Sequence, residues 1–457
     1  MNIYIDVEIS SRELDSKLLL AILAASRGHK VIVSHLTEII SGLKSGALTP
    51  GIFHTTSLFS GSEKISRHQF MIDGDSKITS MDEEGGLIDH GYDKFASIRY
   101  SEQTLEQTSA VFGWGLEDAE TLKRIYPKQS NKIYMTGSPR ADLWKSNFSE
   151  YWGTPQNVPK KPFLLVSSNM FSVSRFVPFY QNIKHLKLLG FFKRDPDFFS
   201  NQFKMEAEDC RMTLAFIDAI NYVAKNNNGF DIVFRPHPIE NIEAWKVFLE
   251  DIPNVHVIQK QSITPWINNS FAIMQNSCTS AIEATVSGKP VVTYIPFKQE
   301  YDREIPNELG YRVETLKELS RTVNTLFDDM QSSDQNKSSK EIPEIVSKKI
   351  YFDKDQLAAE KIIKVWESFD NKSISKKINW IRFYWLLKVS NLRRIGGKIK
   401  KKLFPSRFGP YKENHKFPLL EKHDIRKRVK RLQHVLGIDE KIECNLLSKR
   451  TILIKKS

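Results

Sequence analysis

The chain has 457 residues, 40% of them hydrophobic, which excludes a disordered or collagen-like protein and exceeds what one ordinary core holds. The formal net charge is +13, but residues 371–457 alone hold 25 Lys and Arg against 6 Asp and Glu. The first 370 residues keep 42 basic and 48 acidic side chains, so the basic character belongs to the C-terminal tail.

Cysteine usage and the N-terminal residues predict a cytoplasmic protein. The three cysteines, Cys210, Cys278 and Cys444, lie too far apart for a metal-ligand pattern, which is typical of a reducing compartment. The opening residues lack the basic and apolar regions of a signal peptide, and no run of eighteen apolar residues occurs.

The first third of the chain alternates strand-like and helix-like segments. Residues 2–9 predict a buried strand, and a helix then ends at a Gly before a second strand at 31–34. This opening lacks G-x-G-x-x-G, so a dinucleotide cofactor is not supported. Further strands are predicted near 51–56, 77–89, 109–115 and 132–144, and helices near 36–45, 60–78 and 116–126.

The stretch 149–162 contains three prolines and little apolar periodicity, as expected of an interdomain linker. A strand is predicted at 162–172 and an amphipathic helix at 205–229, whereas 173–203 predicts only helices or an insertion. The pattern then predicts four short strands of a second parallel sheet, FDIVF, VHVIQ, FAIMQ and PVVTYI. It also predicts a helix at 353–369 that closes the globular part.

We therefore expect two Rossmann-like α/β domains, residues 1–150 and 160–370, facing across a cleft, and a basic C-terminal helical extension at 371–457. This is the GT-B plan of many nucleotide-sugar glycosyltransferases. Some epimerases share the plan, so the fold alone does not decide function.

Three carboxylates, Asp82, Glu83 and Glu84, precede Gly85 and Gly86 at the end of a predicted strand. Crowded carboxylates repel one another, so at least one pKa is expected to rise into the range of a general base. The alternative is a solvated acidic turn.

The segment from Arg235 to Pro238 ends another strand, with prolines on both sides of His237. A rigid histidine at this place suits contact with, or protonation of, a phosphate oxygen, and Arg235 suits a bidentate contact to the same group. A purely structural turn is the alternative.

A polar run, Asn276, Ser277, Cys278, Thr279 and Ser280, precedes a predicted helix that Gly288 ends. Hydroxyls and backbone N–H groups there would suit a nucleotide phosphate, and Glu283 would suit a ribose hydroxyl. Simple N-capping is the alternative, and Cys278 is expected to be a small buried residue rather than a nucleophile.

Two further places hold candidate residues. Arg140 follows Gly-Ser-Pro at another strand end and could contact an anionic donor, although ordinary turn chemistry explains the sequence as well. Glu13, Asp15 and Lys17 stand near the first strand-to-helix turn and could reach an acceptor, but a solvated helix start is the simpler interpretation.

These motifs resemble a known family. An acidic pair plus Gly (Glu83 to Gly85), a His-Pro (His237) and a Ser/Thr cluster (277–280) resemble the three motifs of bacterial sialyltransferases and 3-deoxy-manno-octulosonate (Kdo) transferases. The chain is more closely similar to bacterial surface carbohydrate biosynthesis proteins. This likeness runs from RELDSKLLLA to GKPVVTY, covers about residues 1–370, and includes the ILIKK-type ending.

The resemblance implies roles for these residues. Glu83 or Glu84 would be the catalytic base and His237 a phosphate ligand or acid, with Ser277, Thr279 and Ser280 on the CMP phosphate. Asp82 adds a third acidic residue, so the acidic pair of the motif can be aligned in two ways that differ by one residue. Cys278 interrupts the Ser/Thr run. The CMP-sugar would be a co-substrate, with no cofactor and, because no DxD-like motif ends a strand, no metal.

The tail holds aromatic residues among its basic ones, in INWIRFYWLLKV at 378–389 and in the KIKKKLFPSRF that follows. This pattern predicts contact with an anionic membrane surface, on the inner face of the cytoplasmic membrane. The alternatives are a tail packed on the body or on a partner, and nucleic acid, which no recognisable nucleic-acid module supports.

The sequence as a whole predicts a glycosyltransferase of surface polysaccharide or lipopolysaccharide synthesis. It would move an acidic sugar, Kdo or a nonulosonate, from a CMP donor to a glycan or lipid-linked acceptor. The alternatives are a CDP-glycerol- or ribitol-type polyol-phosphate transferase and a non-catalytic partner in glycan assembly or export.

Overall fold

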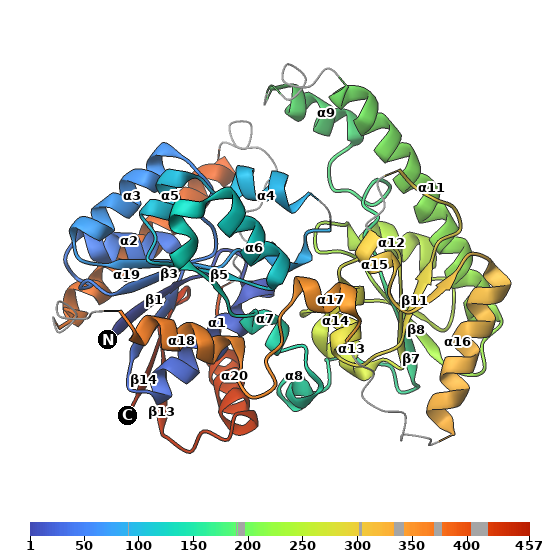
Figure 1. Ribbon diagram of the computed structural model, residues 1–457. Helices are drawn as coiled ribbons and strands as arrows, with labels where there is room; N and C mark the ends of the chain where they lie inside the picture. The colour runs from blue at the N-terminus through green and yellow to red at the C-terminus, as the bar shows by residue number, and fades with distance from the viewer. Residues whose placement is uncertain are drawn as a thin grey trace. The chain divides into compact units, whose positions relative to one another are not determined.

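The computed structural model describes residues 1–89, 91–188, 190, 197–300, 304–332, 342–369, 377–403 and 419–457. Contacts divide the chain into two compact units: Met1–Leu143 with Glu344–Ser457, and Trp144–Pro343 (Figure 1). Each unit has its own sheet, in which strands joined by helices run parallel. The expectation of two Rossmann-like α/β domains is therefore confirmed.

The sheet of the first unit has the strand order β13-β14-β2-β1-β3-β4-β5-β6. The six N-terminal strands are parallel, whereas β14 pairs antiparallel with both β2 and β13. In chain order these strands are β1 (Asn2–Asp6), β2 (Lys30–Ser34), β3 (Ile52–Thr55), β4 (Lys77–Ser80), β5 (Ala110–Gly113), β6 (Ile133–Met135), β13 (Ile442–Ser448) and β14 (Thr451–Lys456).

Helices cover this sheet. The α-helices are α1 (Ser10–Ser26), α2 (Leu36–Lys44), α3 (Ser62–Asp73), α4 (Tyr92–Arg99), α5 (Glu102–Glu106), α6 (Leu116–Ile125), α7 (Pro139–Asp142), α17 (Glu344–Lys349), α18 (Ala358–Glu367), α19 (Trp380–Leu403) and α20 (Lys422–Val435). Two 3-10 turns are η1 (Gly85–Leu87) and η2 (Pro127–Lys132). Helix α1 is buried on nearly all sides because it lies between the sheet and α7, α18 and α20.

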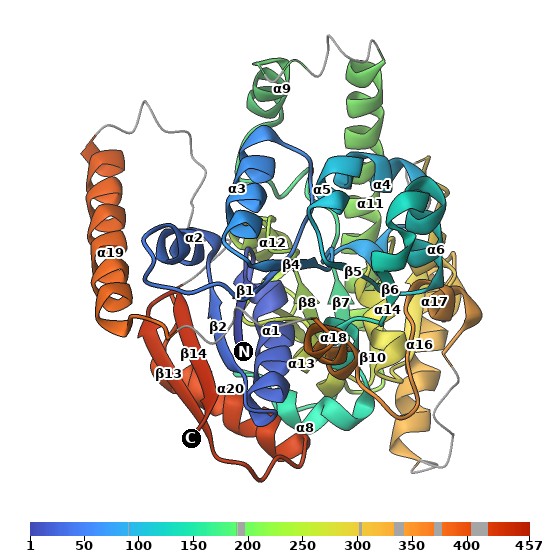
Figure 2. The same cartoon turned by 60° about the vertical axis from the view of Figure 1, so that its left-hand side comes forward.

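The C-terminal segment is part of the first unit. Figure 2 shows the β13–β14 hairpin beside β2, with α20 beside α1 and α19 beside α2. Helix α18 also packs here, where the Trp366 indole N–H donates to Thr79 Oγ1 at 3.1 Å. The expected second domain therefore ends at Pro343 and not at 370, and the expected extension contains a hairpin as well as helices.

The second unit has a fully parallel sheet with the order β12-β11-β10-β7-β8-β9. Its strands are β7 (Phe163–Ser167), β8 (Asp231–Arg235), β9 (Val255–Val257), β10 (Ala272–Gln275), β11 (Val291–Tyr294) and β12 (Tyr311–Val313). Its helices are η3 (Ser146–Phe148), α8 (Ser149–Trp152), α9 (Phe179–Leu188), α11 (Phe198–Lys225), α12 (Ile242–Leu249), α13 (Thr264–Asn269), α14 (Ser280–Val286), α15 (Glu304–Asn307) and α16 (Leu316–Gln331).

In each unit, successive parallel strands of the chain are first placed on one side of the starting strand and then on its other side. In the second unit, β8 and β9 lie on one side of β7, and β10 to β12 lie on the other. Among the first six strands of the first unit, β2 lies on one side of β1 and β3 to β6 lie on the other. Ligands of open α/β sheets bind beyond the carboxyl ends of the strands at such a reversal.

None of the helices in the described part of the chain is long and apolar enough to cross a bilayer.

Candidate functional site

The acidic turn, residues 82–86, follows β4 at the carboxyl edge of the first sheet. Its two glycines allow close packing, because a Cβ on Gly86 would lie 2.6 Å from Trp114 and one on Gly85 would lie 3.2 Å from it. The Trp114 indole also donates to the carbonyl of Asp82 at 2.8 Å. Packing on this tryptophan therefore fixes the backbone of the turn.

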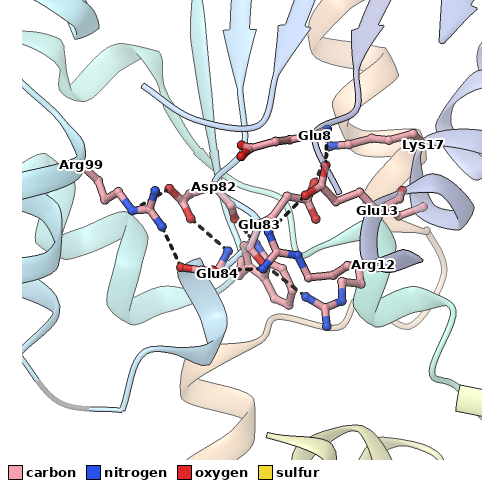
Figure 3. Close-up of polar contacts among 11 residues, drawn as sticks. Glu8, Arg12, Glu13, Lys17, Asp82, Glu83, Glu84 and Arg99 are labelled. Atoms are coloured by element: carbon pink, nitrogen blue, oxygen red, sulfur yellow. Dashed lines mark hydrogen bonds and ion pairs between the residues drawn. The ribbon is translucent and has the colours of Figure 1, made fainter. Parts of the chain in front are cut away.

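Helix α1 brings three charged side chains, Arg12, Glu13 and Lys17, to the acidic turn (Figure 3). Lys17 Nζ lies 2.5 Å from Glu83 Oε1, and the two side chains are only 2% and 5% exposed. Glu13, one turn before Lys17, is fully buried and accepts a hydrogen bond of 2.9 Å from the backbone N–H of Glu8. Residues four apart share a helix face, so Glu13 and Lys17 meet the turn together. We call Glu13, Lys17 and Glu83 the buried triad.

The buried triad contains two carboxylates and one ammonium. Burial, and next the negative charge of Glu83, raise the pKa of Glu13 to about 7, although Lys17 and Arg12 oppose the shift. A carboxylate with this pKa can take a proton near neutral pH, as a general base must. Burial of unbalanced charge costs stability, so such an arrangement points to a functional site.

Arginines hold the rest of the acidic turn. Glu84 is 41% exposed and pairs with Arg12 at 3.0 Å and with Arg99 at 2.7 Å. Burial raises the pKa of Asp82 to about 6, opposed mainly by Arg99. Arg140 donates to the carbonyl of Glu83 at 3.4 Å, so it supports the backbone of the turn.

The expectation of a solvated helix start at Glu13, Asp15 and Lys17 is wrong, since all three residues are buried. The helix is enclosed by α18 and α20, which the sequence pattern did not place there. Asp15 lies outside the buried triad and pairs with Arg428 of α20 at 2.8 Å. The signal that could have revealed the site was a Glu and a Lys four residues apart in an otherwise apolar helix.

His237 lies on the loop after β8, at the carboxyl edge of the second sheet. Its Nδ1 accepts from the backbone N–H of Ile239 at 3.3 Å, which places the ring proton on Nε2. Its carbonyl accepts from Gln259 Nε2 at 2.7 Å. The ring is partly exposed, so a phosphate oxygen can reach a donor whose tautomer is already fixed.

Glu240 organises this loop, although the sequence interpretation did not single it out. Its buried carboxylate accepts from the Trp245 indole N–H at 2.5 Å, from Ser168 Oγ at 2.9 Å and from the His237 backbone N–H at 3.2 Å. Ser174 Oγ donates to it as well, at 3.3 Å. Burial raises the pKa of Glu240 to about 7 in spite of these donors.

We expect Glu240→Ala to destabilise the second unit by at least about 2 kcal/mol. Four donors lose their acceptor, and each buried polar group left unpaired costs about 1–3 kcal/mol. Denaturant unfolding measures the loss, and Glu243→Ala is the control because the Glu243 side chain is exposed and forms an ion pair with Lys246 on the surface of α12. Equal stability of the two variants would contradict this role for Glu240.

Arg235 is engaged by the second unit itself. Its guanidinium donates to the carbonyls of Lys260 and Gln261 and lies over the ring of Trp266. Burial lowers its pKa to about 10. The expected bidentate phosphate contact is therefore replaced by a contact that fixes the 260–261 loop.

The polar run after β10 forms a tight loop. Ser277 has a left-handed backbone (φ 49°), and Asn307 accepts from its N–H at 2.7 Å and donates to its Oγ at 3.0 Å. Asn276 Nδ2 donates to the carbonyl of Tyr294 at 3.0 Å. The Ser280 hydroxyl is 2.8 Å from that of Ser167. Three of the candidate residues thus hold the loop in shape.

Thr279 differs from its neighbours. It is partly exposed, and its hydroxyl has no hydrogen-bond partner within the described residues. Glu283 is buried on α14, a helix of only 7 residues. Cys278 is buried and its N–H donates to Gln275 Oε1, in agreement with a small packed residue. Thr279 is therefore the hydroxyl of this run best placed for a ligand.

The loop after β7 joins the two candidate loops of the second unit. Asn169 Nδ2 donates to the carbonyl of Ser277 at 3.1 Å, and the adjacent Ser168 bonds Glu240 beneath His237. Strands β10, β7 and β8 are neighbours in the sheet. His237 and the 277–280 run therefore lie at one edge of the second sheet, where the strand order reverses.

The chain matches no protein-family model, and no curated protein matches it. Solved structures align with it at low identity. A provisional UDP-N-acetylglucosamine 2-epimerase of Listeria monocytogenes aligns at 14% identity and TM-score 0.47, covering 80% of this chain and 95% of that one. The UDP-GlcNAc 2-epimerase of Methanocaldococcus jannaschii aligns at 12% and 0.45, covering 81% and 100%. The wall teichoic acid polymerase TagF aligns at 11% and 0.40, covering 69% and 72%. Values this low carry no information about activity or ligand.

Proposed function

We propose that this protein is a glycosyltransferase that moves an acidic sugar, Kdo or a nonulosonate, from a CMP donor to a surface glycan or its lipid-linked precursor. The observation that carries the proposal is the buried triad, with the pKa of Glu13 near 7. Transfer to a hydroxyl acceptor needs a base of this kind. The three motifs shared with bacterial CMP-sugar transferases add the donor class.

We assign the base to Glu13 of the buried triad and not to Glu84 of the acidic turn. Both carboxylate oxygens of Glu84 are already engaged, one by Arg12 and the other by Arg99. Glu83 is paired with Lys17, and its charge is one of the causes that raise the pKa of Glu13. Glu83 therefore acts as a positioning residue that raises the proton affinity of Glu13.

Arg12 bridges the base and the acidic turn. Its guanidinium bonds both Glu13, at 3.1 Å, and Glu84, at 3.0 Å, and its side chain is 27% exposed whereas that of Glu13 is 1% exposed. The positive charge of Arg12 opposes the rise of the Glu13 pKa, so displacement of this guanidinium by an acceptor would strengthen the base.

The reaction balances with these groups. The acceptor oxygen forms a bond to the anomeric carbon, and its proton passes to Glu13. The bond from the anomeric carbon to the phosphate oxygen breaks, and its electron pair leaves on CMP. His237 Nε2–H and the Thr279 hydroxyl would donate to the departing phosphate, which leaves as a monoester and needs less neutralisation than a diphosphate.

Release of CMP from a panel of donors tests the proposal. We expect turnover with CMP-Kdo or CMP-sialic acid and none with CDP-glycerol or UDP-N-acetylglucosamine. His237→Ala should raise the KM for the donor about 10- to 100-fold, because a hydrogen bond to a charged group contributes about 1.5–3 kcal/mol. His256→Ala, which removes a histidine paired with Asp231 in the same sheet, is the matched control.

Each other outcome of the panel identifies an alternative. Turnover of CDP-glycerol alone would contradict sugar transfer and identify a polyol-phosphate transferase. Consumption of UDP-N-acetylglucosamine alone would identify epimerase chemistry. A lack of turnover with all four donors, together with unchanged surface glycan in cells carrying Glu13→Gln, would identify a non-catalytic assembly partner.

A further inference from the structure

Helix α19 has one buried face and one exposed apolar face. Phe383 and Leu387 are buried in the core cluster that contains Ile39 of α2. Asn379 N–H donates to the carbonyl of Ala47 at 2.9 Å, which holds the start of the helix against the body. These contacts fix the rotation of α19 about its own axis, so they also fix which side chains point outward.

The outward side chains of α19 are large and apolar. Ile381 is 86% exposed, Leu392 67%, Trp385 63%, Ile395 47% and Tyr384 44%. Their spacing, 381, 384, 385, 392 and 395, is that of a single helix face. At 1.5 Å per residue the face is roughly 20 Å long. Monomeric soluble proteins seldom leave such a face uncovered, so it marks an interaction surface. We call these five residues the outer face of α19.

Charge identifies the class of partner. The sequence from 380 to 403 contains 8 Lys and Arg and no Asp or Glu. Of these, Lys388 is exposed within the outer face, and Arg382 and Arg393 are exposed beside it. An apolar face with Trp and Tyr, on a helix whose charged residues are all basic, complements a bilayer with acidic headgroups.

Helix α20 is the internal comparison. It is also basic, but its apolar residues Ile425, Val429 and Leu432 are buried and it pairs with α1 through Arg428. The exposed side of α20 at Lys427 and Lys430 is polar, without an apolar face. Both helices are therefore basic, but α19 differs from α20 in its exposed aromatic and aliphatic side chains.

We propose that the outer face of α19 docks on an anionic membrane surface, with Trp385 and Tyr384 among the headgroups and Arg382, Lys388 and Arg393 on acidic lipids. The sequence alone assigned this contact to the whole of 371–457. Among the described residues of this segment, the structure favours α19, because α20 and the hairpin bury their apolar residues on the first unit. Residues 371–376 and 404–418 of the expected surface lie outside the described residues.

Vesicle flotation with the full-length protein tests the proposal. We expect binding to phosphatidylcholine vesicles with about one third phosphatidylglycerol, and loss of binding on pure phosphatidylcholine or in high salt. Arg382→Ala with Lys388→Ala should weaken binding roughly 20- to 30-fold at low salt, at about fivefold per charge. Lys427→Ala with Lys430→Ala, on α20, is the matched control and should bind like the parent protein.

A second pair of substitutions tests the apolar side chains of the outer face of α19. Trp385→Ser with Leu392→Ser should abolish flotation at any salt concentration, with thermal unfolding unchanged because both side chains are exposed. Val247→Ser, at an equally exposed apolar position on α12, is the control. Equal flotation of the Trp385/Leu392 variant and the parent, equal binding to neutral vesicles, or flotation lost in the α20 variant alone would each overturn the proposal. CMP release from the donor is measured separately with a soluble acceptor, so failure here leaves the proposed function standing.

Discussion

Glu13→Gln is expected to lower kcat by about 10²- to 10⁴-fold and to leave the affinity for CMP unchanged. The substitution keeps the shape of the side chain and removes the only carboxylate of α1 that both contacts the acidic turn and has a pKa near 7. A general base contributes a factor of this size. Steady-state kinetics and CMP titration calorimetry measure the two quantities.

The pH dependence follows from the same group. Turnover of the parent enzyme should rise with pH through about 7 and then level off, because Glu13 must lose its proton before it can accept another. Glu13 in the folded chain binds its proton more tightly than in the unfolded chain, where its pKa is about 4.5. Its contribution to stability therefore falls as pH rises from about 4.5 to 7. Glu13→Gln should gain stability relative to the parent above pH 7.

Asp15→Asn is the control for Glu13→Gln. It is also a buried acidic position on α1, but it pairs with Arg428 outside the buried triad. The control should lose stability and keep kcat and the pH profile. If Glu13→Gln retained parental turnover with a parental pH profile, the assignment of the base would fall.

Lys17→Met should cost about 3–5 kcal/mol of unfolding free energy. It leaves two buried carboxylates, Glu13 and Glu83, without the ammonium that lies 2.5 Å from Glu83. Loss of one partner of a buried ion pair has a cost of this size because the remaining charge stays desolvated. Guanidinium or urea unfolding at pH 7 measures it.

A second substitution separates charge from packing. Lys17→Met with Glu83→Gln removes the stranded charge and should recover a large part of the stability, although not the activity. Lys361→Met is the control, since Lys361 pairs with Asp353 at 2.5 Å where both side chains are more than 20% exposed, and it should cost less than about 1 kcal/mol. A loss of similar size in Lys17→Met and Lys361→Met would show that the buried pair is not what stabilises the triad.

Local patterns predicted most of the parallel strands. Apolar β-branched runs gave β1, β2, β7, β8 and β10 to within a few residues, because short buried strands have a composition that helices seldom share. The sequence missed β12 (Tyr311–Val313), which has two exposed residues among its three and lacks that composition. Element type was thus predictable where burial was nearly complete.

Long-range packing was not predictable from these patterns. Glu13 and Lys17 have the composition of a solvated helix start, and only the enclosure of α1 by segments more than 300 residues away buries them. Glu240 likewise has the local pattern of a loop residue, and its role depends on Trp245 of α12 and on Ser168 and Ser174, which follow β7. Charged residues show no local sign of the partners that the fold brings to them.

The pairing of β14 with β2 also sets an order of events during synthesis. Thr451 bonds Ser34 across 417 positions of the chain, so the first sheet lacks an inner strand until almost the entire chain has left the ribosome. At about 5–20 residues per second this interval lasts tens of seconds. Throughout it, the edge of β2 offers unpaired backbone groups to other chains, whereas the continuous unit Trp144–Pro343 can already fold. Chaperone dependence during translation is therefore expected to concentrate on the N-terminal strands.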